Sequence, residues 1–106
     1  MYFEKWYYVY ILTNRSKTFY VGITGKITQR IFQHKTGAFE GFTSRYNLDR
    51  LVYWEKFKHV NEAIAREKQL KGWSRIKKTQ LIVSMNPTWE DLAEDWFPEL
   101  KKKTNT

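Results

Sequence analysis

Residues 7–22 read YYVYILTNRSKTFYVG, two apolar and aromatic segments joined by a short polar one. Tyr7–Leu12 carries aromatic and aliphatic side chains at both alternating positions, which is typical of a central strand. Thr13–Lys17 is polar and predicts a turn, and Thr18–Gly22 predicts a second strand. We therefore expect a β-hairpin at the start of the fold.

The register of this hairpin decides which tyrosines share a face. If the turn centres on Arg15, Tyr10 and Tyr20 are direct cross-strand neighbours on one face. A shift of one residue would place them on opposite faces of the sheet. The sequence leaves both arrangements open.

The rest of the chain alternates between helical and extended patterns. These patterns predict an α+β fold, in which helices flank a small, mostly antiparallel three-stranded sheet. Residues 1–100 would form one domain, and the basic segment 101–106 a frayed tail. After the hairpin we predict a helix over 27–35, a loop over 38–47, a strand over 51–57, a helix over 60–71, a helix over 75–84 capped by Ser74, and a short helix reaching Trp96 after Thr88.

The helix predicted over 60–71 carries an acid in an unexpected place. Its apolar side chains share one side of a helical wheel: Val60, Ala63, Ile64 and Leu70. Glu67 lies in the middle of this apolar side, whereas Glu62 points to solvent. A carboxylate facing the interior needs a proton, a cation or a metal ion. Lys71, four residues on, offers an ordinary ion pair.

The composition limits the classes of function. The chain has 19 Lys and Arg against 11 Asp and Glu, a net charge of +8 that favours a polyanionic partner such as nucleic acid. It has no cysteine, which excludes disulfides and thiolate metal sites, and only two histidines, which disfavours a histidine zinc site. It has neither an apolar run of membrane length nor a signal-peptide pattern, so we expect a cytoplasmic protein that does not enter a membrane.

Two short motifs and two single residues together resemble the GIY-YIG nucleases. Tyr8-Val9-Tyr10, nine intervening residues and Tyr20-Val21-Gly22 resemble the paired signature of that family. Arg30 and Glu67 stand where the family carries its arginine and its metal-binding glutamate. The resemblance spans residues 6–89 and is closest to small stand-alone members, which look like the N-terminal nuclease domain of the bacterial excision-repair incision subunit. Tyr8 replaces the first glycine of the signature.

The resemblance implies a metal-dependent endonuclease that hydrolyses phosphodiester bonds in DNA, in repair or recombination. Glu67 would bind one Mg²⁺ or Mn²⁺ ion, and Arg30 would clamp a phosphate oxygen. Tyr10 is our candidate general base and Tyr20 would position water or phosphate, although these roles could be reversed. His34 shares a helix face with Arg30 and would bond phosphate or assist proton transfer; a structural histidine is the alternative.

Further polar side chains are candidates for holding the substrate. Each also has an ordinary interpretation, as a solvent-facing cation or, for the asparagine before Pro87, as a turn residue. The candidates are Lys26, Lys35, Arg45, Lys71, Arg75 and Asn86. Two other functions remain open on sequence grounds: a non-catalytic nucleic-acid-binding module, suggested by the charge, and a protein-interaction domain, suggested by the many aromatic residues.

Overall fold

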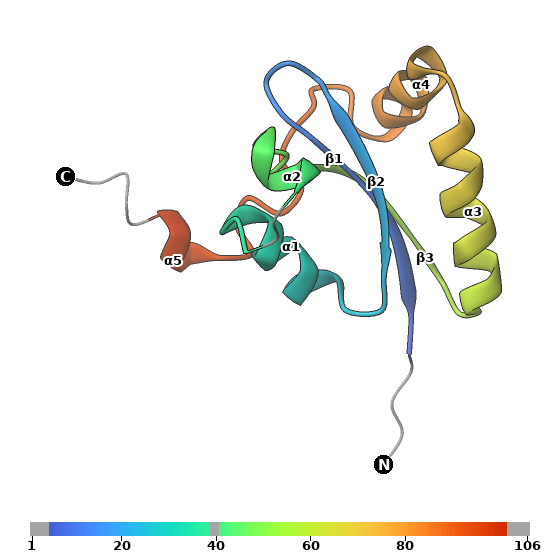
Figure 1. Cartoon of the computed structure of the whole chain (residues 1–106), viewed down its shortest axis with the longest axis horizontal. Coiled ribbons are helices and arrows are strands. Elements are labelled where there is room, and N and C mark those ends of the chain that lie inside the picture. The colour runs from blue at the N-terminus through green and yellow to red at the C-terminus, as the bar shows by residue number, and fades with distance from the viewer. Residues whose placement is uncertain (1–4, 39–40, 102–106) are drawn as a thin grey trace.

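An antiparallel sheet of three strands forms the centre of the molecule (Figure 1). The structure, a computed structural model, describes residues 5–38 and 41–101. The strands β1 (Tyr7–Thr13), β2 (Phe19–Thr24) and β3 (Arg50–Phe57) lie in the order β2-β1-β3. The predicted α+β class and the three-stranded antiparallel sheet are confirmed.

Helices cover both faces of this sheet. Figure 1 shows α1 and α5 on one side and α3 on the other. No helix among the described residues combines the length and the apolar character that crossing a membrane requires. The helices are α1 (Ile27–Lys35), α2 (Phe42–Arg45), α3 (Val60–Gly72), α4 (Arg75–Met85) and α5 (Pro98–Lys101).

The register of the hairpin differs from the one considered above. Tyr10 pairs with Gly22 and Leu12 pairs with Tyr20, so the turn centres on Ser16 and not on Arg15. Tyr10 and Tyr20 are therefore diagonal neighbours on one face, with ring centroids 6.2 Å apart. The turn is held by the side chain of Asn14, whose Oδ1 accepts a hydrogen bond from the Thr18 amide at 3.0 Å.

The alternation of side chains along β1 divides the interior into two clusters. Val9 and Ile11 pack with residues of α3 and α4, whereas Tyr10 and Leu12 pack with α1 and the C-terminal segment. Both faces of β1 are buried, as expected for a central strand. The two clusters place α1 and α3 against opposite faces of the sheet.

The buried side of α3 is narrower than the helical wheel predicts. Ala63 and Leu70 are buried, but Val60 and Ile64 are 41% and 37% exposed. The prediction that Val60 and Ile64 face the interior was therefore wrong. The side of α3 that meets the sheet is the one that carries Ala63, whose small side chain permits close approach. Glu67 lies on the same side of α3, one turn after Ala63 and one turn before Leu70.

The final segment shows one confirmed cap and one wrong helix. Ser74 caps α4 as predicted, since its side chain accepts a hydrogen bond from the Lys77 amide at 3.2 Å. The helix predicted up to Trp96 is absent, and this segment consists of turns before α5. Its backbone instead docks on β3, where the Leu92 amide donates to the Leu51 carbonyl at 2.7 Å. The predicted tail begins at Lys101, which is the last residue of α5. Its other residues, 102–106, lie outside the part of the chain that the structure describes.

Candidate active site

Two tyrosines and a histidine converge on the α1 face of the sheet. The Tyr10 ring is fully buried, and its Oη lies 3.0 Å from Nε2 of His34. The rings of Tyr20 and His34 lie 5.6 Å apart between centroids. His34 points inward because α1 packs through Ile31 and His34, one turn apart on the same side of the helix. The structure thus brings together three residues that the sequence analysis identified as candidate site residues.

Gly22 makes room for this arrangement. It lies opposite Tyr10 in the hairpin, and a Cβ atom at this position would meet Cζ and Oη of Tyr10 at 2.5 Å. Only a residue without a side chain allows the tyrosine ring to lie across the neighbouring strand. The glycine of the second motif therefore has a local steric function, which is to admit the Tyr10 ring.

Arg30 acts electrostatically on both members of the Tyr10–His34 pair. Burial and the nearby Tyr20 raise the pKa of Tyr10 well above its usual value of about 10, although Arg30 partly opposes this rise. Burial, followed by the positive charge of Arg30, lowers the pKa of His34 to about 4. At neutral pH the tyrosine is therefore a phenol and the histidine is uncharged.

Thr43 completes a hydrogen-bonded line that the sequence did not predict. Its Oγ1 lies 3.3 Å from Nδ1 of His34, and the residue is buried. Thr43 belongs to α2, which arises within the segment predicted to be a loop. The available signal was the hydroxyl-rich Thr43-Ser44 pair near His34 in the sequence. A partner at Nδ1 fixes the ring orientation of a histidine whose Nε2 faces Tyr10.

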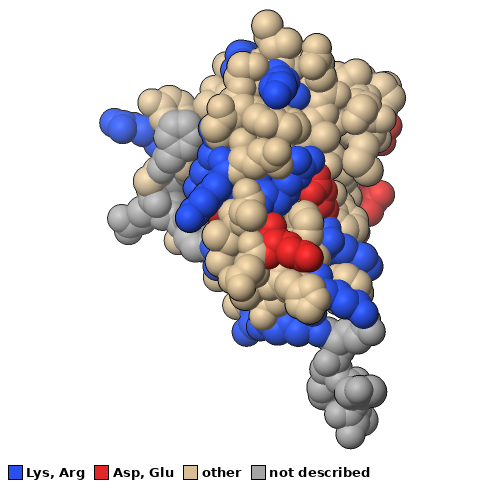
Figure 2. Space-filling model, turned by 90° about the vertical axis from the view of Figure 1, so that its right-hand side faces the viewer, with Lys and Arg blue, Asp and Glu red and all other residues tan. Residues whose placement is uncertain are grey.

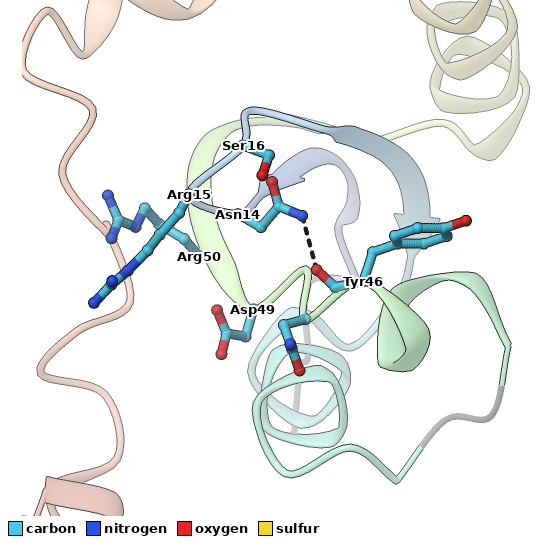
Figure 3. A pocket seen from close by; sticks show the side chains of 7 residues that line it. Asn14, Arg15, Ser16, Tyr46, Asp49 and Arg50 are labelled. Carbon is cyan, nitrogen blue, oxygen red and sulfur yellow. Dashed lines mark hydrogen bonds between the residues drawn. The ribbon is translucent and has the colours of Figure 1, made fainter.

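A polar hollow borders the segment that follows α2. It has a volume of about 330 Å³ and lies between the hairpin turn and residues 46–50 (Figure 3). In Figure 3 the Asn14 side chain reaches across to Tyr46, where Nδ2 donates to the backbone carbonyl at 2.7 Å. This bond ties the hairpin turn to the segment next to Thr43. None of the predicted site residues lines the hollow among those the structure describes.

The low pKa of His34 predicts how stability depends on pH. The pKa of His34 is about 6.5 in the unfolded chain and about 4 in the folded protein. Between these two pH values the unfolded chain therefore binds a proton at His34 that the folded protein does not bind. We therefore expect the free energy of unfolding to decrease as the pH falls through this window. Urea unfolding at pH 7 and pH 5 measures the decrease, and His34→Gln should diminish it.

The other histidine provides a control for this pH dependence. His59 is exposed just before α3, so His59→Gln removes a histidine without disturbing the buried cluster and serves as the matched control. NMR titration of the imidazole signals gives the His34 pKa directly. A His34 signal that titrates near 6.5 would contradict the burial argument.

Glu67 belongs to α3, which packs on the opposite face of the sheet from α1. Its side chain is 16% exposed, and its Oε2 lies 3.0 Å from Nζ of Lys71. The ordinary ion pair considered in the sequence is therefore present. Arg66, the preceding residue, fixes the rotation of α3 by donating to Glu55 of β3 at 2.9 Å. Glu62 is exposed, as the wheel predicted.

The face of the molecule that carries α3 is rich in charge. Figure 2 shows the face that carries α3, where acidic side chains lie between patches of Lys and Arg. Within residues 5–38 and 41–101, no three His, Cys, Asp or Glu side chains gather as a metal site. A metal ion at Glu67 would thus depend on one carboxylate, together with water and substrate.

Two predicted substrate contacts have structural partners instead. The ammonium of Lys35 binds the Asp91 carboxylate and donates to the Asp49 carbonyl at 2.9 Å. The Asn86 side chain is buried, donates to the Val52 and Glu90 carbonyls at 3.1 and 2.9 Å, and accepts from the Glu90 amide at 3.0 Å. Both side chains hold the C-terminal segment against the fold, so we omit them from the candidate site.

The other predicted contacts are exposed cations. Lys26 precedes α1, Arg45 ends α2, and Lys71 is on α3. Arg75 begins α4 and lies over the ring of Phe19 on β2, 5.0 Å from its centroid. These positions leave all four side chains accessible to a polyanion.

Comparison with known proteins agrees with the motifs and the fold. The family model described as the GIY-YIG catalytic domain matches residues 6–80. A UPF0213 protein of Clostridium perfringens is 38% identical over 88 residues, which are 83% of this chain and 95% of the relative. A UPF0213 protein of Syntrophus aciditrophicus is 37% identical over 81 residues, 76% of this chain and 92% of the relative.

A solved structure shares the fold. The solution NMR structure of a UPF0213 protein from Bacillus halodurans aligns with a TM-score of 0.55 and 31% sequence identity, covering 85% of this chain and 97% of that one. It supports the α+β arrangement described above. By sequence motif, family match and fold, the chain belongs to the GIY-YIG nuclease superfamily.

Proposed function

We propose that this protein is a metal-dependent endonuclease that hydrolyses phosphodiester bonds in DNA. The observation that carries the proposal is the convergence of Tyr10, Tyr20 and His34 on one face of the sheet, with Arg30 close enough to shift the pKa of both Tyr10 and His34. A cation beside neutral groups that can exchange protons suits a reaction in which water attacks a charged phosphate. The net charge of +8 favours a polyanionic substrate.

The difference in burial supports distinct tasks for the two tyrosines. Tyr20 is half-buried, so its hydroxyl can meet the attacking water or a phosphate oxygen. Tyr10 is fully buried against His34, and its raised pKa disfavours a free phenolate. We therefore favour the reversed assignment, with Tyr20 contacting the attacking water and the Tyr10–His34 pair behind it. Arg30 would hold a non-bridging phosphate oxygen through its planar fork of donors.

Glu67 fits a single divalent ion. Mg²⁺ is commonly held by one or two carboxylates together with water and substrate phosphates, so one hard oxygen ligand is sufficient. When bound, the ion would add positive charge near the phosphate and the leaving oxygen. The ammonium of Lys71 would have to release Glu67, and because the Lys71 side chain is more than half exposed, water can solvate the ammonium when it does so.

The outer edge of β2 is where the two faces of the sheet meet. β2 is an edge strand, with α1 on one face and α3 on the other. Arg75 lies over Phe19 at the start of β2, and Lys26 follows its end. We propose that the substrate strand runs along this edge, since Tyr20 lies on β2 and Glu67 on α3, which packs against β2.

A cleavage assay tests the proposed function. Purified protein is incubated with duplex, nicked and branched DNA in the presence of Mg²⁺ or Mn²⁺. We expect cleavage, and a loss of about 10²-fold or more in Tyr20→Phe, which is typical of removing a group that transfers or positions a proton. Tyr10→Phe is the comparison: a larger loss there would assign water activation to Tyr10. Binding without cleavage of any substrate would favour the non-catalytic nucleic-acid-binding module.

A further inference from the structure

A hollow of about 290 Å³ lies where the start of β1, the end of β2 and the start of α1 meet. Three of the side chains that line it are cationic: Lys5, Lys26 and Arg30. Gln29 and Gln33 add uncharged amides that can donate hydrogen bonds. Of the residues that the structure describes, none that lines this hollow is acidic. The hollow is therefore positively charged and rich in donors.

Local contacts give the hollow a defined shape. The Lys26 amide donates to Oγ1 of Thr24 at 3.0 Å, which fixes the loop between β2 and α1. A Cβ at Gly25 would lie 3.2 Å from Cε and 3.4 Å from Nζ of Lys5, so the glycine lets the lysine lie close across this loop. Figure 1 shows the start of β1 running beside this loop.

Arg30 connects this hollow to the candidate active site. It lines the hollow and also shifts the pKa of Tyr10 and of His34. A phosphate bound among Lys5, Lys26 and Arg30 would therefore be a near neighbour of a phosphate held beside Tyr20. Like charges gathered in one hollow repel each other, and an anion between them replaces this repulsion with attraction.

We propose that this hollow is a second phosphate subsite, which holds a phosphate group next to the one at the cleaved bond. The identity of the neighbouring phosphate, at the cleaved bond, rests on the proposed function. The binding of an anion in the hollow does not depend on that function. Two sources share this chemistry: the adjoining phosphodiester within the strand and a terminal phosphate at a strand end. Lys5 and Lys26 supply charge, and the amides of Gln29 and Gln33 suit phosphate and sugar oxygens.

The test measures DNA binding without divalent metal, so that it does not depend on cleavage. The double variant Lys5→Ala/Lys26→Ala is compared with wild type across a series of salt concentrations. Each phosphate contact contributes about 0.7 to 0.9 to the slope of log affinity against log salt, so the slope should fall by about 1 to 2. Lys56→Ala/Lys58→Ala, which removes two cations of β3 and its following turn, is the charge-matched control.

Modified DNA identifies the source of the phosphate. A neutral methylphosphonate linkage is moved along the strand, and a 5′-phosphate is compared with a 5′-hydroxyl. If the phosphate lies within the strand, a methylphosphonate at one position should abolish the difference in DNA binding between wild type and the double variant. If it lies at the strand end, the 5′-hydroxyl should do so. The proposal is overturned if the double variant has the slope of wild type or of the control, or if no single phosphate accounts for the difference. If one phosphate position accounts for the difference in binding but no DNA is cleaved in the cleavage assay, only the endonuclease proposal is refuted and the phosphate subsite stands.

Discussion

Replacing Glu67 by alanine is expected to reduce DNA cleavage about 10³-fold while leaving the fold intact. A divalent ion is worth several kcal/mol of transition-state stabilisation, and about 4 kcal/mol corresponds to three decades in rate. The cost to stability is small, because the lost Glu67–Lys71 pair is an i,i+4 contact whose lysine is more than half exposed. Such pairs contribute about 0.3 to 0.5 kcal/mol.

The same helix carries a matched control. Glu62 is exposed in the first turn of α3, so Glu62→Ala removes an equal charge away from the sheet and should cleave like wild type. Single-turnover cleavage rates, urea unfolding and calorimetric titration with Mn²⁺ separate the effects on chemistry, stability and metal binding. Equal cleavage rates for wild type and Glu67→Ala would refute the assignment of Glu67 as the metal ligand.

Replacing Gly22 by alanine is expected to destabilise the protein and to disable the Tyr10–His34 pair together. The new Cβ would meet Cζ and Oη of Tyr10 at 2.5 Å, and the ring has no open space to enter because it is fully buried. Overpacking of this kind costs about 1 to 3 kcal/mol. A displaced Tyr10 would also lose its hydrogen bond to His34, worth about 1 kcal/mol. Urea unfolding and cleavage rates measure the two effects.

A second glycine gives the opposite expectation. Gly72 is the last residue of α3, and a Cβ there would meet no atom within 4 Å. Gly72→Ala should therefore stabilise the protein through the helix preference of alanine, by no more than the value of about 0.5 to 1 kcal/mol that holds in the middle of a helix. NMR signals of the Tyr10 ring should shift in Gly22→Ala and not in Gly72→Ala. An undisturbed Tyr10 in a stable Gly22→Ala protein would contradict the steric role of this glycine.

The sequence was sufficient for features that depend on near neighbours. Runs of aromatic and aliphatic residues predicted the strands of the hairpin, and the cap at Ser74 was identified from one residue type at a helix start. The bounds of α1 were predicted at both ends. The paired tyrosine motifs, with Arg30 and Glu67, identified the family because their spacing is a property of the chain itself.

Features that depend on distant partners were less accessible. Lys35 is held by Asp91, and Asn86 by Val52 and Glu90, so side chains expected to meet substrate have structural partners instead. The segment after Asn86 binds β3 through Leu51, which local helix signals could not indicate. Thr43 reaches His34 only because α2 folds back on α1.

The sequence by itself determined the three strands, the helices α1, α3 and α4, and the family, and it suggested the candidate site residues. The tertiary structure decided how they are arranged: the turn centred on Ser16 puts Gly22 under the Tyr10 ring, and α3, which carries Glu67, packs on the opposite face of the sheet from α1. The physical reason lies in the range of the interactions. Periodicity and capping act within a few residues, whereas register and packing depend on contacts between strands and helices that are remote in the chain.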